Sequence, residues 1–291
     1  MPTPTASHES KPAASPLLAA TECRYLVDPP LAGERNMAVD ETLLDAANAQ
    51  GTATLRFYQW REPTLSLGYF QTYDERHEHL ASRDCAVVRR TTGGGAIVHD
   101  RELTYSFAAP LANQSRLNHS DLVSIFHYAA SEALALQGAS AGPLCCDETP
   151  AAEANAAFLC FQRRERGDVV SRTATPGDHA PGDPPSLPDG EVPPHRQPKL
   201  LGSAQRRRQG AILQHGSLLL AQSAAAPELP GLRETSGREI DVPRLIEDWS
   251  RILAARLGLR LVAATLGDDE MATAEQLATT KFASSAWLRR R

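Results

Sequence analysis

Apolar and polar side chains alternate in several short segments of the chain, as they do in half-buried β-strands. Leu103, Tyr105 and Phe107 are apolar, and the two residues between them carry hydroxyl groups. The same kind of pattern predicts strands at 23–27, 55–60, 64–70, 85–90, 103–107, 158–170 and 199–220. Many of these strands follow one another closely enough to pair as hairpins.

Helical periodicity replaces this alternation elsewhere. Asn36 is a residue type that caps helices, and it precedes a helical segment that ends at Gln50 before a glycine. Ser120 stands in the same position before an apolar stripe that runs to Leu134. Further helices are predicted at 76–82, 243–257 and 270–280. Because strands and helices are interspersed, we expect an α+β fold with a mixed β-sheet core flanked by helices.

Two segments lack the apolar residues that a core requires. Residues 1–20 are predicted to form a disordered N-terminal tail, because they begin without a basic stretch or a continuous apolar run. Residues 171–197 contain seven prolines and almost no apolar side chains, so they are predicted to be a disordered insertion between two strands. The rest of 21–291 is then one domain.

Composition narrows the class of protein. Hydrophobic residues make up 42% of the chain, yet no apolar run is long enough to cross a bilayer, so no membrane partner is expected. A net charge of −5 gives no reason to expect nucleic acid, and the arginine runs at 206–208 and 289–291 are interpreted as solvated faces. Five cysteines without a CxxC pair indicate reduced thiols and a cytoplasmic location.

The segment RRTTGGGAIVHD at 89–100 places three consecutive glycines between two predicted strands. Glycines contribute no side-chain packing, but they allow a sharp turn or a close approach of the main chain to a ligand. The spacing matches neither GxxxxGK[ST] nor GxGxxG, which excludes those two phosphate-binding mechanisms. From these residues alone, a flexible turn and a ligand-binding loop both stay open.

A second segment, KLLGSAQRRRQGAILQHGSLLL at 199–220, contains one of only three lysines in the chain. Lys199 stands at the head of a predicted strand, close to the small residues 202–204. Its ammonium group can stabilise negative charge that develops on an acyl oxygen. It can equally be a solvated charge at the end of a strand.

Together these segments resemble the lipoate–protein ligase and octanoyltransferase family, which shares its catalytic fold with biotin–protein ligases. The resemblance continues in NMAVDETLL at 36–44, LRFYQWREPTLSLGYFQ at 55–71, LTYSF at 103–107, CFQRRERGDVV at 160–170 and KFASSAW at 281–287. It covers nearly all of the chain outside the tail and the proline-rich segment. It implies that 21–291 is a biotin/lipoate protein ligase-like catalytic domain.

The resemblance also implies a set of site residues. Lys199 is expected to hold the acyl carbonyl. The residues expected to line the acyl or acyl-adenylate pocket are Arg90, Gly94, Gly95, Ala96, Ile97, Val98 and His99. The neighbouring wall is expected to comprise Ser203, Ala204, His215 and Ser217.

Two chemistries occur in this family, and Cys160 is the residue that discriminates between them. The CF pair at 160–161 resembles the cysteine-bearing loop of one group of octanoyltransferases, and the arginines that follow it favour a thiolate. Cys160 can otherwise be a small apolar residue packed beside Phe158 and Phe161. The following GDV element resembles the ligase branch, in which Asp168 would face a nucleotide or the substrate lysine.

We therefore expect an enzyme that moves an octanoyl group from octanoyl-acyl carrier protein to a lysine of a lipoate-dependent carrier protein, through a thioester on Cys160. The acceptor would be the glycine-cleavage H protein or the lipoyl domain of a 2-oxoacid dehydrogenase, and no cofactor or metal would be needed. The first alternative is a lipoate–protein ligase, which uses ATP and Mg²⁺ to form lipoyl-adenylate. The second is a non-catalytic relative that binds an acyl group or a carrier.

Overall fold

The computed structural model describes residues 18–112, 119–144, 157–173 and 197–291. The predicted tail lies outside these residues up to position 17, and the predicted insertion lies outside them from 174 to 196. The predicted bounds of the insertion were too wide at both ends. Ser171 is the last residue of a strand, and Gln197 is buried.

Within the described residues, the main sheet has eight strands in the order β11-β1-β2-β6-β10-β9-β8-β7. Their bounds are β1 Glu22–Val27, β2 Ala53–Tyr58, β6 Glu102–Pro110, β7 Ala141–Pro143, β8 Val169–Ser171, β9 Lys199–Arg208, β10 Ala211–Leu219 and β11 Arg260–Ala263. β1 runs parallel to β11 and to β2, whereas every pairing from β2 to β7 is antiparallel. The sheet is mixed, as predicted.

A smaller sheet has three described strands in the order β4-β3-β5, with bounds β4 Ala86–Arg89, β3 Thr64–Leu67 and β5 Ile97–His99. β3 lies between its neighbours, parallel to β4 and antiparallel to β5. The glycine-rich segment connects β4 to β5. It therefore stands at one end of this small sheet.

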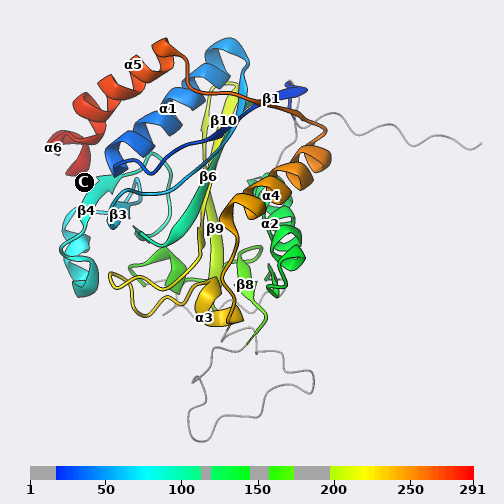
Figure 1. The fold of residues 1–291 in the computed structure, drawn as a ribbon. Coiled ribbons are helices and arrows are strands. Elements are labelled where there is room, and N and C mark those ends of the chain that lie inside the picture. The colour runs from blue at the N-terminus through cyan, green and yellow to red at the C-terminus, as the bar shows by residue number, and fades with distance from the viewer. Residues whose placement is uncertain (1–17, 113–118, 145–156, 174–196) are drawn as a thin grey trace, which may run out of the picture.

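Helices cover both faces of the main sheet (Figure 1). On one face, α2 (His119–Leu136) and α4 (Val242–Leu257) bury Phe126 and Trp249 against Tyr105 of β6. On the other face, α1 (Gly33–Gln50) packs with α5 (Asp268–Leu277) and the π-helical turn η6 (Ala278–Phe282). The alternation along β6 explains this division, because successive side chains enter opposite layers. The described residues therefore form an α+β fold.

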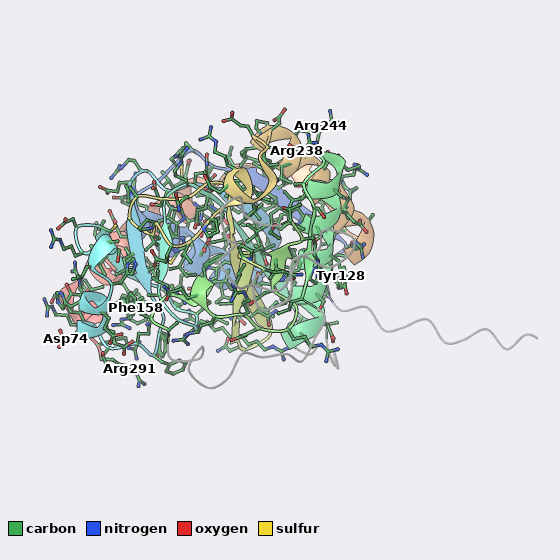
Figure 2. The ribbon with its side chains drawn as sticks, turned by 90° about the horizontal axis from the view of Figure 1, so that it is seen from below. Asp74, Tyr128, Phe158, Arg238, Arg244 and Arg291 are labelled. Carbon is green, nitrogen blue, oxygen red and sulfur yellow. The ribbon has the colours of Figure 1, made fainter. Side chains whose placement is uncertain are left out.

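The remaining elements are short. They are the 3₁₀ turns η1 (Asp74–Glu78), η2 (Leu80–Ser82) and η4 (Cys160–Gln162), and the helices α3 (Leu232–Ser236) and α6 (Ser285–Leu288). The outer surfaces of α2 and α4 carry exposed side chains such as Tyr128 and Arg244 (Figure 2). No helix in the described ranges is long and apolar enough to cross a membrane.

Three predictions of local structure were wrong. Asn36 does not cap α1, which begins three residues earlier. Instead its side chain donates to Leu31 O and Gln59 O and accepts from Arg56. Ser120 lies inside α2, so it is not the cap of that helix.

The third wrong prediction is the strand at 158–170. Most of that segment is a 3₁₀ turn and an irregular loop, and regular strand begins only at Val169. β11 was not predicted. Its side chains are half-buried or exposed, so it carries no clear apolar alternation.

Candidate functional site

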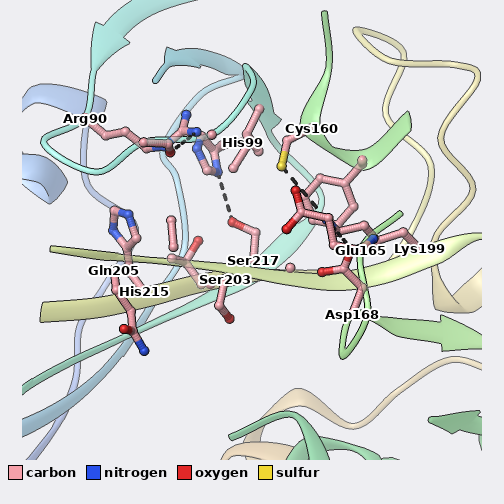
Figure 3. Close-up of a pocket in the computed structure, with 18 of the residues that line it drawn as sticks. Arg90, His99, Cys160, Glu165, Asp168, Lys199, Ser203, Gln205, His215 and Ser217 are labelled. Carbon is pink, nitrogen blue, oxygen red and sulfur yellow. Dashed lines mark hydrogen bonds and ion pairs between the residues drawn. The ribbon is translucent and has the colours of Figure 1, made fainter. Parts of the chain in front are cut away.

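A pocket of about 250 Å³ lies between the main sheet and the smaller sheet (Figure 3). β9 and β10 form one wall, the glycine-rich segment and β5 form the opposite wall, and η4 closes one end. The residues expected from the sequence that line this pocket are Arg90, Gly94, Ile97, His99, Cys160, Asp168, Lys199, Ser203, Ala204, His215 and Ser217. The fold thus brings together side chains from positions 90 to 217.

Gly95, Ala96 and Val98 do not line the pocket, which corrects the sequence-based expectation. In β5 alternate side chains face opposite ways, so Ile97 points into the pocket whereas Val98 joins a separate apolar cluster. Ala96 N donates to Phe158 O, and Ala96 O accepts from Cys160 N at 2.7 Å. These residues therefore position the chain that carries Cys160.

Gly95 allows this close approach of two backbone segments. A Cβ atom at Gly95 would lie 3.0 Å from Phe158 O and 3.2 Å from Cys160 N. Any larger residue there would push the cysteine-bearing turn away from the pocket wall. The requirement for glycine at this position is thus one of packing.

Arg90 holds the glycine turn from inside the protein. Its guanidinium donates to Gly93 O at 2.8 Å, to Gly95 O at 2.6 Å and to Ser66 O at 2.9 Å. Burial lowers the pKa of Arg90 to about 10, so the side chain still carries its charge at neutral pH. With several donors committed to the backbone, Arg90 mainly shapes the wall on which His99 and Ile97 lie.

Cys160, Lys199 and Asp168 form a contiguous cluster at one end of the pocket (Figure 3). Lys199 Nζ lies 3.9 Å from Cys160 Sγ and 2.7 Å from Asp168 Oδ2. The side chains of Lys199 and Asp168 are only 3% and 9% exposed. This arrangement sets an ammonium group beside a thiol in a place that water reaches poorly.

The charge of Lys199 is maintained by its neighbours. Burial alone would lower the pKa of Lys199, but the negative charges of a Cys160 thiolate and the Asp168 carboxylate outweigh it and raise that pKa. Lys199 therefore stays an ammonium and is able to stabilise negative charge on sulfur or oxygen. The resemblance to the ligase branch implied that Asp168 would face a nucleotide or the substrate lysine. In the structure the Asp168 carboxylate contacts Lys199 instead.

The cation beside Cys160 is Lys199, whereas the sequence led us to expect the arginines that follow the cysteine. Arg163 and Arg164 follow the cysteine, but they donate to the backbone oxygens of Ala157 and Gln197. The other described thiols lie outside the pocket, and burial raises the pKa of Cys23 to about 12. Among the described cysteines, Cys160 is the one placed to act as a nucleophile.

Two buried histidines of the pocket are fixed by carboxylates that sequence reasoning had not assigned. His99 stacks on Trp60 with ring centroids 3.8 Å apart, and its Nδ1 lies 2.8 Å from Glu102 Oε1. His215 Nδ1 lies 3.1 Å from Asp40 Oδ2. Each carboxylate holds an imidazole ring in one orientation against the pocket.

A chain of buried hydrogen bonds supports the floor of the pocket and was also missed. His127 Nδ1 lies 2.6 Å from Gly167 O, and its Nε2 lies 2.7 Å from Ser203 Oγ. Tyr105 Oη lies 2.6 Å from the same Ser203 oxygen. A carbonyl only accepts, so Nδ1 carries the proton and Nε2 accepts from Ser203. His127 lies in α2, far along the chain from the segments 89–100 and 199–220. No sequence pattern therefore indicated that it supports the pocket.

The stability of the protein should depend on the charge of His127. Burial, and then the charge of Lys199, lowers the pKa of His127 to about 4, although its bond to Gly167 O acts the other way. An unfolded histidine has a pKa of about 6.5, so between these values only the unfolded chain binds the proton. The free energy of unfolding should therefore fall as the pH drops, with His127 contributing about 2 kcal/mol of that loss by pH 5.

Chemical denaturation at pH 7 and pH 5 measures this effect. His127→Gln, which keeps a donor and an acceptor, should lose less stability between the two pH values than the unchanged protein does. Equal losses in both proteins would contradict the role of His127.

Gly202 should be needed to keep Lys199 in place. A Cβ atom at Gly202 would lie 2.5 Å from Lys199 Cε and 2.9 Å from its Nζ, so alanine must displace the ammonium group. We expect Gly202→Ala to reduce turnover roughly 10–100-fold, because misplacing a group that stabilises charge is costly. Gly210→Ala, on the adjacent hairpin turn with open space around it, is the matched control and should change turnover little. Equal turnover in both variants would show that the spacing is unimportant.

The chain is similar to known proteins over most of its length. The model of the lipoyl protein ligase A/B catalytic domain matches residues 32–227. The chain is 32% identical to octanoyltransferase LipM of Brevibacillus brevis, over 92% of this chain and 99% of that protein. It is 31% identical to octanoyltransferase LipM of Moorella thermoacetica, over 88% and 93% of the two chains.

Solved structures share the fold at lower identity. A putative lipoate protein ligase from T. acidophilum with bound lipoic acid superposes with a TM-score of 0.68 at 18% identity, covering 93% of this chain and all of that one. A lipoate–protein ligase A bound with ATP superposes with a TM-score of 0.66 at 18% identity, covering 92% of this chain and 98% of the other. A structure described as part of an archaeal lipoylation system, a bi-partite lipoate protein ligase and its E2 lipoyl domain from Thermoplasma acidophilum, superposes with a TM-score of 0.67 at 18% identity, covering 93% of this chain and 97% of the other.

Proposed function

Because this chain belongs to the lipoyl protein ligase A/B catalytic-domain family, we propose that it transfers an octanoyl group from octanoyl-acyl carrier protein to a carrier lysine through a thioester on Cys160. It is an enzyme of the octanoyltransferase and lipoate–protein ligase type, active in protein lipoylation. The observation that carries the proposal is the contact between Lys199 Nζ and Cys160 Sγ at 3.9 Å inside the pocket.

In the first half-reaction, the Cys160 thiolate attacks the thioester carbonyl of the donor. A bond forms between Sγ and the acyl carbon, and the bond from that carbon to the donor sulfur breaks. In this proposal Lys199 donates a hydrogen bond to the oxyanion of the tetrahedral intermediate, and its ion pair with Asp168 keeps the Lys199 side chain charged and oriented. The donor leaves as a thiol after taking up a proton.

The acyl chain would extend from Cys160 into the apolar part of the pocket. Met37, Trp60 and Ile97 supply apolar surface there. His99 stacks on Trp60, and its hydrogen bond to Glu102 keeps the imidazole ring in that position. Burial of the chain favours binding by the hydrophobic effect. The thioester would then lie at the charged end, where an amine can reach it.

In the second half-reaction, a lysine of the glycine-cleavage H protein or of a lipoyl domain attacks the acyl-enzyme. The bond from the acyl carbon to Sγ breaks, an amide bond forms, and the Cys160 thiolate is restored, while the two protons that the lysine ammonium gives up pass to solvent. Splitting the exchange in this way makes each step easier than direct transfer between two proteins. No cofactor is needed for either step.

Intact-mass measurement after mixing with octanoyl-acyl carrier protein, with and without ATP, tests this proposal. We expect one octanoyl adduct in both conditions, and loss of that adduct when H protein or a lipoyl domain is added. Turnover that requires ATP, Mg²⁺ and free lipoate would instead identify a ligase that works through lipoyl-adenylate. Tight octanoyl binding without turnover from any donor would identify a non-catalytic relative.

A further inference from the structure

Glu165 is an acidic residue of the pocket that the steps above leave without a role. The described acidic residues that line the pocket are Asp168 and Glu165. The Asp168 carboxylate is already bound, since its Oδ2 accepts from Lys199 Nζ and from Glu165 N, both at 2.7 Å. The Glu165 carboxylate makes no ion pair with any residue in the described ranges, and the residue is exposed.

Two hydrogen bonds to Asp168 hold the backbone at Glu165. Its N–H donates to Asp168 Oδ2, and its carbonyl oxygen accepts from Asp168 N at 3.0 Å. Gly167, with φ of 92°, closes the tight turn between these two residues. In Figure 3 the Glu165 side chain points into the pocket on the side of Cys160 and Lys199. The turn thus holds a carboxylate without an ion-pair partner among the described residues, whose negative charge helps to raise the pKa of Lys199, at the edge of the reacting groups.

An acceptor lysine meets two obstacles at this end of the pocket. In water its pKa is about 10.4, so it arrives as an ammonium ion that is not nucleophilic. It must also approach the thioester beside the buried ammonium of Lys199, which repels it. An anion at the entrance would overcome the repulsion, and a base there would accept the proton that the attack releases.

We propose that Glu165 binds the ε-ammonium of the acceptor lysine, accepts the proton whose loss makes the nitrogen nucleophilic, and assists the loss of the second proton as the amide forms. This inference rests on the proposed function of Cys160. As the bond between the lysine nitrogen and the acyl carbon forms, the bond to Cys160 Sγ breaks and returns the electron pair to sulfur. Two protons leave the nitrogen. The first passes to the Glu165 carboxylate before the attack and from there to solvent, which the exposed side chain reaches, and the second follows the same route when the tetrahedral intermediate collapses to the amide.

The two half-reactions can be measured separately on the full chain. Acylation of Glu165→Gln by octanoyl-acyl carrier protein should proceed within about twofold of the unchanged enzyme, since no acceptor lysine takes part in that half-reaction. Discharge of the purified acyl-enzyme to a lipoyl domain should slow by roughly 10²-fold, a size typical of losing a general base. Glu165→Asp should recover part of that rate. Glu239→Gln, which removes a charge outside the pocket, is the matched control and should discharge normally.

Hydroxylamine distinguishes a role toward lysine from damage to the site, because it is an uncharged nucleophile at neutral pH. It should discharge the Glu165→Gln acyl-enzyme as fast as the unchanged one. Normal discharge of Glu165→Gln to the lipoyl domain would overturn the inference, and so would equal slowing with hydroxylamine and lysine. If the unchanged enzyme formed no acyl adduct at all, the proposed function itself would fail and the inference with it.

Discussion

Replacing Cys160 by alanine is expected to abolish the octanoyl adduct and to lower octanoyl transfer by roughly 10³-fold or more, the scale seen when a covalent nucleophile is removed. The reason is chemical, since alanine offers no atom that can hold the acyl group between donor and acceptor. The Cys160 side chain is small and only partly buried, so the folded protein should lose little stability. Intact mass and a gel-based transfer assay measure the two effects.

Cys85→Ala is the matched control for this experiment. Cys85 is a half-buried thiol outside the pocket, and burial raises its pKa, so it should neither accept octanoate nor affect transfer. An adduct that persists in Cys160→Ala, or transfer at the normal rate without Cys160, would refute the thioester route. An adduct that moves to Cys85 would do the same.

The second large effect is expected from Lys199→Met, which keeps much of the side-chain volume but removes the ammonium group. Acylation of Cys160 should slow by roughly 10²–10³-fold, the range found when a donor to an oxyanion is lost. The variant should also lose about 3 kcal/mol of unfolding free energy, because Asp168 then becomes a buried charge without its partner. Single-turnover acylation and chemical denaturation measure the two quantities.

The double variant Lys199→Met, Asp168→Asn separates catalysis from stability. Removing both charges should restore much of the lost stability, since no unpaired carboxylate is left in the interior. Acylation should stay slow, because the oxyanion still lacks its donor. Recovery of the acylation rate in the double variant would show that Lys199 acts only by neutralising Asp168.

The sequence by itself determined many of the strands and the longer helices, and it drew attention to two segments that line the pocket. Alternation in 103–107 predicted a strand with one apolar face, and β6 has that face against α2 and α4. Residue types and spacing drew attention to the glycine-rich segment and to the strand from Lys199, the family resemblance assigned them to a pocket, and residues of both line it. These features are readable because periodicity, glycine content and a rare lysine are local properties of the chain.

The tertiary structure alone decided how these parts meet. β9 pairs with β8, which brings Lys199 to Asp168 across 31 positions of the chain, and the bridge from Ala96 to Leu159 sets Cys160 beside both. The arginines near Cys160 in sequence bind backbone oxygens, and a lysine 39 positions away contacts the thiol. Long-range contacts follow from strand order and packing, which no local pattern encodes, so the partners of Cys160, Asp168 and His127 became visible only in the folded chain.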